Sequence, residues 1–206
     1  MVTCGSIVLR GGQSRRMGRP KDGLDFGGET LLERVVGRLG ERAGPIVVVS
    51  ATNQDPPMLS GVVIMAHDAV AGRGPLEGLA AGLRAMPEGV ELVYATGVDA
   101  PFLDVRLIEL LEALIGDHDL AIPWALGRYH PLAAVYRRAP ALPAVEALLS
   151  QGKSRLTDVT IALKTRVVSE SELRADDPAL ARLRNINSPE DYSRAIEDLA
   201  RRRGNR

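Results

Sequence analysis

Residues 6–21 read Ser-Ile-Val-Leu-Arg-Gly-Gly-Gln-Ser-Arg-Arg-Met-Gly-Arg-Pro-Lys, and this stretch decides the fold. Its apolar start, residues 6–9, is typical of a buried strand. The segment from Leu9 to Lys21 holds three glycines, four arginines and a lysine. A glycine pair after a strand lets backbone N–H groups approach an anion, and cationic side chains bind phosphate oxygens. The stretch therefore predicts a phosphate-binding loop.

Two common phosphate-binding patterns are absent from this loop. It lacks the Gly-Lys-Ser/Thr ending of a Walker A loop, and Gly11-Gly12 does not supply the Gly-x-Gly-x-x-Gly dinucleotide fingerprint. The next strong helix signal comes only at Thr30. We therefore expect a long basic loop that lies over a triphosphate. A tight turn followed by a surface lysine is the alternative for an isolated glycine pair.

Composition limits the class of protein. The 206 residues fit one domain, or one domain with a small lobe, and 45% are hydrophobic but only 3% aromatic, so the core is expected to be aliphatic. Equal numbers of basic and acidic residues, 26 of each, argue against nonspecific nucleic-acid or anionic-membrane binding. Cys4 is the single cysteine, and no apolar run approaches the ~20 residues of a membrane span. We expect a cytoplasmic protein.

Strand and helix signals alternate through the first half of the chain. Strands are expected at residues 5–9, 45–50, 62–65 and 92–96, all as buried parallel strands. Helices are expected to begin at Thr30, with Glu33 completing a capping box, at Pro75, and after a capping Asp104. This alternation predicts an α/β fold with three α/β/α layers and a mostly parallel central sheet.

The second half is less regular. Strands are expected at 120–123, 132–136 and 165–168, and helices at 142–149, at 154–163 with a Ser154 cap, and from Ser188-Pro189 onward. Residues from Arg201 are expected to be frayed and solvated.

Polar residues follow the expected strands of the first half. Because ligands of parallel sheets bind at the carboxyl ends of the strands, the basic loop, Ser50, Asp68 and Asp99 predict a site at one rim. Asp99 ends an apolar strand, where a carboxylate can hold Mg²⁺ through one oxygen while substrate phosphates fill other positions. A turn aspartate before a proline is the alternative. Asp68 can accept from a nucleobase N–H or a ribose hydroxyl, or be an ordinary loop acid.

Several segments resemble the nucleotidyltransferases that build nucleotide forms of the molybdenum cofactor. The most specific are Leu9-x-Gly11-Gly12 with Ser14-x-Arg16-Met17-Gly18-x-x-Lys21, Asp99-Ala100-Pro101-Phe102-Leu103, and Asn185-Ile186-Asn187-Ser188-Pro189-Glu190-Asp191. Residues 72–78 and 130–137 resemble further loops of the same family. The glycine pair and the two asparagines are typical of its guanylyl branch rather than its cytidylyl branch. Three residues depart from the usual family choices: Arg10 replaces alanine, Pro20 aspartate and Ser50 asparagine.

The resemblance implies a Rossmann-like nucleotidyltransferase fold and transfer of GMP from GTP to the phosphate of molybdenum-molybdopterin, with release of pyrophosphate. Because the acceptor phosphate is already anionic, catalysis is expected to rest on positioning and charge neutralisation, with Mg²⁺ as cofactor. The single domain, 1–206, would then comprise a nucleotide-binding half (1–104), an acceptor-binding half (105–200) and a flexible tail (201–206).

The resemblance also assigns roles to residues. The expected catalytic residues are Arg16, Lys21 and Asp99, with Asp99 as the metal ligand. The expected nucleotide-binding residues are Leu9, Arg10, Gly11, Gly12, Lys21, Ser50, Asp68 and Asp99. The expected acceptor-binding residues are His130, Lys153, Arg155, Asn185 and Asn187.

Each of the acceptor assignments has a purely structural alternative. Lys153 and Arg155 suit an acceptor phosphate or a solvated surface, and Asn187 with Ser188 suits a helix cap. Tyr136 suits the core of a strand end. Two other functions also fit the sequence: a nucleotidyltransferase of cytidylyl or sugar-phosphate specificity, and a non-catalytic nucleotide-binding or regulatory module on the same fold. Expected partners are GTP and molybdenum-molybdopterin, together with molybdoenzymes or their chaperones.

Overall fold

The computed structural model describes residues 3–10, 21–51, 59, 63–68 and 74–204. Three of the expected site residues, Gly11, Gly12 and Arg16, lie outside these ranges. Within them, no helix is both long and apolar enough to cross a membrane.

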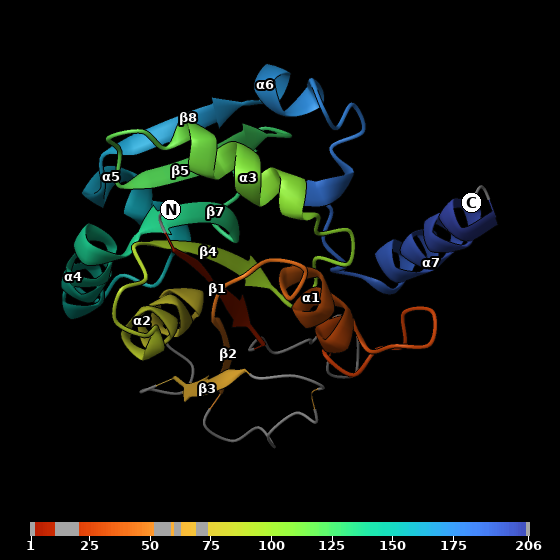
Figure 1. The fold of residues 1–206 in the computed structure, drawn as a ribbon, viewed down its shortest axis with the longest axis horizontal. Coiled ribbons are helices and arrows are strands. Elements are labelled where there is room, and N and C mark those ends of the chain that lie inside the picture. The colour runs from red at the N-terminus through yellow and green to blue at the C-terminus, as the bar shows by residue number, and fades with distance from the viewer. Residues whose placement is uncertain (1–2, 11–20, 52–58, 60–62, 69–73, 205–206) are drawn as a thin grey trace.

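One eight-stranded mixed sheet runs through the described chain (Figure 1), in the order β3-β2-β1-β4-β7-β5-β6, with β8 paired to β5. The strands are β1 (Cys4–Leu9), β2 (Ile46–Ser50), β3 (Ile64–His67), β4 (Leu92–Gly97), β5 (Leu120–Ala125), β6 (Arg128–Tyr129), β7 (Ala133–Arg137) and β8 (Thr165–Ser169). Strands β3, β2, β1 and β4 are mutually parallel, and β8 is parallel to β5. Strand β7 is antiparallel to both β4 and β5. The expected α/β fold with a largely parallel sheet is confirmed.

Helices cover both faces of this sheet. One face carries α1 (Leu31–Leu39) and α3 (Val105–Leu114), and the other carries α2 (Pro75–Ala85), α4 (Arg138–Ser150) and α5 (Val159–Ala162). Helix α7 (Pro189–Gly204) extends away from the sheet, and its Ala195 and Leu199 join the first core. Strand β1 alternates between the two cores, because Val8 packs toward the first set of helices whereas Ile7 and Leu9 pack toward the second. This alternation produces the three layers.

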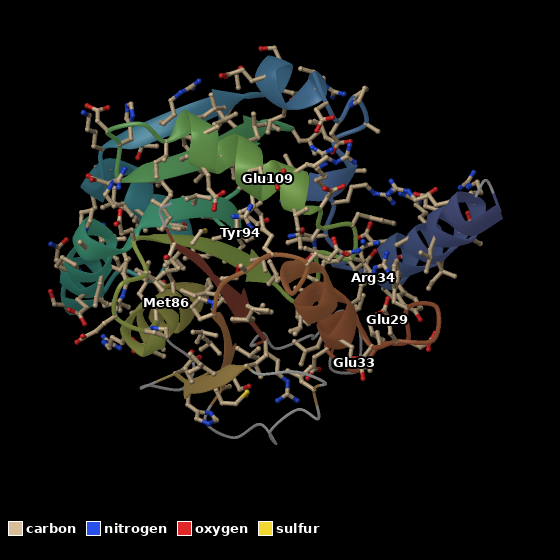
Figure 2. All side chains as sticks on the ribbon, in the orientation of Figure 1. Glu29, Glu33, Arg34, Met86, Tyr94 and Glu109 are labelled. Carbon is tan, nitrogen blue, oxygen red and sulfur yellow. The ribbon has the colours of Figure 1, made fainter. Side chains whose placement is uncertain are left out.

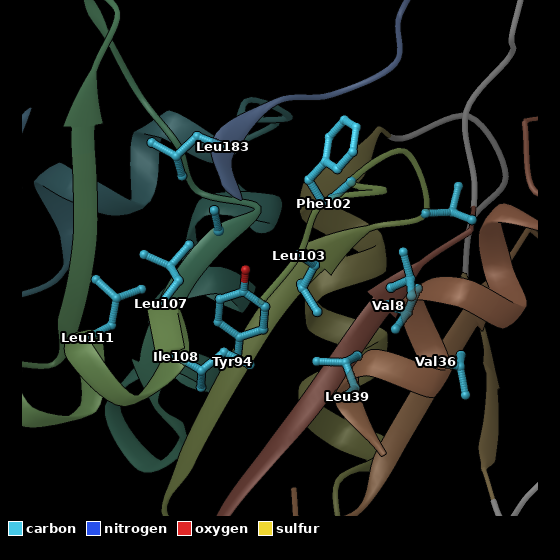
Figure 3. Packing of buried hydrophobic residues seen from close by; sticks show 14 of the residues in the cluster. Val8, Val36, Leu39, Tyr94, Phe102, Leu103, Leu107, Ile108, Leu111 and Leu183 are labelled. Atoms are coloured by element: carbon cyan, nitrogen blue, oxygen red, sulfur yellow. The ribbon is translucent and has the colours of Figure 1, made fainter. Parts of the chain in front are cut away.

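The core on the α1 and α3 face is packed around Tyr94 of β4. Figure 3 shows its ring beside Ile108 of α3 and close to Leu103. Complete burial raises the pKa of the Tyr94 hydroxyl, so it remains protonated at any physiological pH. On the opposite face Met86 (Figure 2) packs against β1 at Gly5, where a Cβ atom would lie 2.5 Å from its sulfur. Glycine at this position therefore permits close packing of α2's end on the sheet.

Capping residues fix the helices beside the expected site. Thr30 and Glu33 form the expected capping box: the Glu33 amide donates to the threonine hydroxyl at 3.1 Å, and the Thr30 amide donates to the glutamate at 2.8 Å. Asp104 caps α3 as expected. Arg34 bonds Glu29 and the Pro101 carbonyl at 2.7 Å each, which ties α1 to the segment after β4; Figure 2 shows it near Glu29.

The second half departs from the sequence expectation in several places. Helix α4 begins at Arg138 rather than residue 142, because prolines are tolerated in a first turn, although Pro143 lies further inside. The expected Ser154 cap is wrong: a 3₁₀ turn, Leu156–Asp158, follows Arg155 without a side-chain cap. Helix α7 continues to Gly204, and Arg201 within it is exposed as expected; the flexible tail of residues 201–206 stays a prediction.

Other elements were not expected or differ in burial. Strand β6, helix α6 (Glu170–Arg174) and a second 3₁₀ turn (Ala181–Leu183) were missed because each is short. Strand β3 was expected to be buried on both sides, but its residues are half-buried or exposed. The reason is its place at the sheet edge, where only β2 pairs with it.

Candidate functional site

The sheet order brings the carboxyl ends of four parallel strands side by side. Leu9 at the end of β1 pairs in register with Val49 of β2 and with Gly97 of β4, and Ser50 pairs with His67 of β3. Arg10, Ser50, Asp68 and Asp99 therefore follow neighbouring strand ends at one rim.

Three expected site residues meet at the centre of this rim. The Lys21 Nζ atom lies 3.1 Å from Asp99 Oδ2 and 3.1 Å from Asn187 Oδ1. Solvent reaches only a small part of the Lys21 and Asp99 side chains. When substrate binds, a lysine and a carboxylate paired in this way can change partners: the lysine can bind a substrate phosphate, and the carboxylate can bind a cation.

The chain around Asn187 is fixed by its own hydrogen bonds. The Ile186 amide donates to the Asp99 carbonyl at 2.9 Å, which fastens this segment to the end of β4. The amides of Asn187 and Ser188 donate to Asp191 Oδ2, and the Asp191 amide donates back to Ser188 Oγ at 3.2 Å. The capping interpretation of this segment is thus confirmed, and the Asn187 side chain is left to reach Lys21.

A buried ion pair that sequence reasoning missed joins both sides of the basic loop. Arg10 Nε lies 2.5 Å from Asp22 Oδ2, and the two side chains are only 12% and 9% exposed. Arg10 also donates to Ser50 Oγ at 3.4 Å. The Asp22 carbonyl accepts the Leu32 amide of α1 at 3.3 Å, so the residue after Lys21 is fixed to that helix. The unusual Arg10 could have predicted this pair, because an arginine directly after a buried strand is shielded from solvent and then requires an acidic partner nearby.

Asp68 lies at the β3 end of the rim. Its amide donates to the Ser50 carbonyl at 3.1 Å, and its carboxylate lies against Gly78 of α2, where a Cβ atom would be 3.3 Å from Oδ1. Partial burial, followed by the nearby negative charge of Glu77, raises the pKa of the Asp68 carboxyl above its usual value. A carboxylate that is poorly solvated in this way favours partners that donate hydrogen bonds to it.

The expected acceptor residues fall in three places. The Ser154 carbonyl lies at the entrance of α2, where a Cβ atom on Gly74 would be 3.4 Å from it, and Gly74 adopts a φ of +84°. This contact holds the exposed Lys153 and Arg155 at the same rim as the basic loop. Asn185 precedes the segment fastened to Asp99 and is half-buried.

His130 has a different environment. It is buried, its Nε2 atom lies 3.0 Å from the Ala125 carbonyl, and its amide donates to the Pro123 carbonyl at 3.0 Å. Burial lowers the pKa of the imidazole, so the ring is neutral and Nε2 donates to the carbonyl. Tyr136 is a core residue, as its structural interpretation predicted, and its hydroxyl donates to the Pro131 carbonyl at 2.9 Å.

The donor chemistry of the rim suits a hard divalent cation shared with substrate. No group of three or more His, Cys, Asp or Glu side chains in the described ranges is arranged to hold a metal by itself. Mg²⁺ commonly binds to one or two carboxylates and completes its shell with water and substrate phosphates. Asp99 at the centre of the rim fits that requirement.

In an α/β/α domain, a polar rim at the parallel strand ends is the usual position of a ligand site. Residues 6–166 match the family described as the MobA-like NTP transferase domain, and the chain belongs to that family.

Two sequence relatives extend the comparison. The chain is 43% identical over 171 residues to a probable molybdenum cofactor guanylyltransferase of Mycobacterium tuberculosis, covering 79% of this chain and 83% of that protein. It is 36% identical over 195 residues to a protein of the same name from Mycobacterium marinum, covering 92% of each.

Solved structures share the fold. Molybdopterin-guanine dinucleotide biosynthesis protein A of Archaeoglobus fulgidus superposes with a TM-score of 0.78 at 24% identity, covering 96% of this chain and 99% of that one. The 2-C-methyl-D-erythritol 4-phosphate cytidylyltransferase of Thermus thermophilus gives 0.68 at 21% identity, covering 98% and 100%. The expected nucleotidyltransferase fold is confirmed.

Proposed function

We propose that the protein is a molybdenum cofactor guanylyltransferase. It transfers GMP from GTP to the phosphate of molybdenum-molybdopterin and releases pyrophosphate. One observation carries the proposal. At the strand ends of a MobA-like domain, the Lys21 ammonium group lies 3.1 Å from a side-chain oxygen of Asp99 and 3.1 Å from one of Asn187, although the three residues come from distant segments of the chain. The names of relatives at 36% and 43% identity support the choice of guanylyl transfer.

The main difficulty of this reaction is to bring two polyanions into line. The acceptor phosphate is already a nucleophile, so no general base is needed and positioning with charge neutralisation suffices. Lys21 binds the triphosphate by exchanging its bond to Asp99 for one to a phosphate oxygen. Asp99 would hold Mg²⁺, which when bound supplies neutralisation of the triphosphate charge. Asn187 keeps the Lys21 side chain directed at the reacting centre while Lys21 exchanges Asp99 for a phosphate oxygen.

The remaining roles divide along the rim. Asp68, at the end of β3, orients the nucleoside. Ser50, at the end of β2, is fully buried, so it acts indirectly by accepting from Arg10 at 3.4 Å. The backbone of Gly11 and Gly12 and the Arg16 guanidinium would bind the triphosphate, as the family resemblance implies. Lys153, Arg155 and Asn185 face the acceptor side. Molybdoenzymes or their chaperones as protein partners, and a cytoplasmic location, stay predictions.

Nucleotide preference is the first test of this function. The apo protein is titrated calorimetrically with GTP and with CTP, each with Mg²⁺, and pyrophosphate release is then followed with molybdenum-molybdopterin. We expect GTP to bind at least about tenfold more tightly than CTP, and turnover with GTP alone. A preference for CTP would assign the cytidylyl reaction instead. Tight GTP binding without any turnover would favour the non-catalytic module.

A matched pair of variants assigns the nucleoside contacts. Asp68→Asn keeps the size of the side chain and removes the charge, and should weaken GTP binding about tenfold, the loss expected for a hydrogen bond to a charged group. Asp158→Asn makes the same change at the last residue of the 3₁₀ turn and should leave GTP affinity unaltered.

A further inference from the structure

An exposed aromatic pair lies at the tip of the β5–β6 hairpin. Trp124 and Tyr129 are opposite each other in the register, with ring centroids 4.6 Å apart and planes at 69°. Trp124, the only tryptophan of the chain, is 42% exposed, and Leu126 in the turn is 57% exposed. In a chain with only 3% aromatic residues, placing two of them together at the surface points to a ligand.

The pair lies at the same rim as Lys21 and Asp99. Strand β7 is antiparallel to both β4 and β5, so β4 and β5 run in the same direction and end at the same edge of the sheet. Two strand spacings, about 10 Å, separate β4 from β5 at Ala121, the last residue of β5 that pairs with β7, and β5 continues from there to Trp124 in the same direction. A molecule whose phosphate is held near Asp99 can therefore extend along the rim to Trp124.

The pair also lies on the sheet face that carries the expected acceptor cations. Leu120 and Ile122 of β5 pack into the core on the α2 and α4 side, and Trp124 follows them on the same face by alternation. Tyr129 packs against the edge of that core. The segment with Lys153 and Arg155 joins the same face, because Leu156 is buried in the same core and Ser154 lies on Gly74 at the start of α2.

The hairpin that presents the pair is held rigidly. Its two turn residues, Leu126 and Gly127, have φ angles of +53° and +72°, and a leucine in this left-handed region is strained. The Leu126 amide donates to Glu170 Oε2 at 2.9 Å. On the other side of the turn the buried His130 donates to the Ala125 carbonyl. Two side chains from outside the turn therefore fix its backbone.

We propose that Trp124 and Tyr129 form the stacking surface for the pterin ring of the acceptor; this rests on the proposed function. A pterin is a flat heteroaromatic ring whose face stacks on exposed aromatic side chains. Its anionic phosphate is complemented by cations at the rim, Lys21 near Asp99 and the exposed Arg128, Lys153 and Arg155. His130 is a positioning residue here, acting through the hairpin backbone.

The single tryptophan makes the proposal directly testable. Titration of the apo protein with 6-hydroxymethylpterin should quench the Trp124 fluorescence saturably, and Tyr129→Ala should weaken the pterin affinity about tenfold. Ile161→Ala, which truncates another exposed apolar residue on α5, is the matched control and should change nothing. GTP affinity, measured by calorimetry, should be equal in all three proteins.

Turnover separates this proposal from the function on which it rests. Trp124→Ala should raise the KM for the molybdopterin acceptor about tenfold and leave the KM for GTP and kcat unchanged. If the wild type transfers GMP and this variant keeps the wild-type acceptor KM, the stacking surface is disproved and the function stands. If the wild type transfers no GMP, the function fails, and the quenching titration still decides whether pterin binds at Trp124.

A second copy of the chain is the competing occupant of this surface. Sedimentation of the wild type and Trp124→Ala distinguishes it, with the pterin affinity of both proteins measured by calorimetry because the variant has lost the fluorescent side chain. A wild-type dimer that becomes monomeric on substitution, with pterin affinity unchanged, would overturn the stacking proposal. An unchanged oligomeric state together with lost pterin binding supports it.

Discussion

The two ends of the rim are built in different ways. At the β1 and β4 end, Lys21, Asp99 and Asn187 are charged or polar side chains that satisfy one another. At the β5–β6 end, apolar rings are presented by a turn whose backbone is fixed by Glu170 and His130. On the proposed function, the first arrangement exchanges partners when substrate binds, whereas the second is preformed. The comparison indicates that one end performs charge chemistry and the other supplies shape.

The strongest test of the charged end is removal of its carboxylate. Asp99→Ala should lower the rate of GMP transfer about 1,000-fold, equivalent to about 4 kcal/mol of transition-state stabilisation, because both the cation site and the Lys21 partner are lost. Pyrophosphate release under saturating GTP measures it. Stability should change little, since the Ile186 amide bonds the Asp99 main chain and not its side chain.

A matched control uses a carboxylate that pairs with lysine away from the rim. Asp117 lies 2.6 Å from Lys164 and is largely exposed, so Asp117→Ala should retain wild-type turnover. An Asp99→Ala enzyme within tenfold of the wild-type rate would exclude the charged end as the reacting centre.

The position of the charged end was largely predictable from the sequence, because it depends on residue types at the ends of strands. Asp99 follows an apolar run and Lys21 closes a glycine-rich basic stretch, and strand ends of a parallel sheet converge whatever the details of packing. Asn187 was predicted from a family motif, but its contact with Lys21 depends on a hydrogen bond between Ile186 and the Asp99 carbonyl, which no local pattern reveals.

The aromatic end was not predictable for the opposite reason. Strand β6 has only two residues, and its turn contains a leucine where glycine or asparagine would be the usual signal. Trp124 continues an apolar strand, so it resembles a core residue until β5 is seen to extend beyond the helices. The sequence predicts His130 as an acceptor-binding residue, but only the fold shows that its ring faces the Ala125 carbonyl.

The Arg10–Asp22 pair tests how far the charged end depends on its support. Asp22→Ala leaves the shielded Arg10 without its carboxylate and should lower the free energy of unfolding by about 3 kcal/mol, as measured by urea denaturation. Lys21 is the next residue, so GTP affinity should fall as well. The double variant Arg10→Ala/Asp22→Ala should recover part of the stability, because no buried charge is then left unpaired.

That recovery is the diagnostic result. If both single variants and the double variant lose stability additively, the two side chains do not act as a pair. Arg38→Ala, which removes an exposed arginine paired with Glu41 on α1, provides the matched control and should cost less than about 1 kcal/mol.

The smallest expected effect concerns the strained turn at the aromatic end. Leu126→Gly should raise the free energy of unfolding by about 1 kcal/mol, because glycine adopts a positive φ without the cost that leucine bears there. Its exposed side chain buries little that would be lost. The same variant should bind 6-hydroxymethylpterin more weakly than the wild type if the rigidity of the hairpin matters, since a more flexible turn must be ordered on binding. Gains in both stability and pterin affinity would show that the strain serves no purpose in binding, and would confine the role of the hairpin to its two rings.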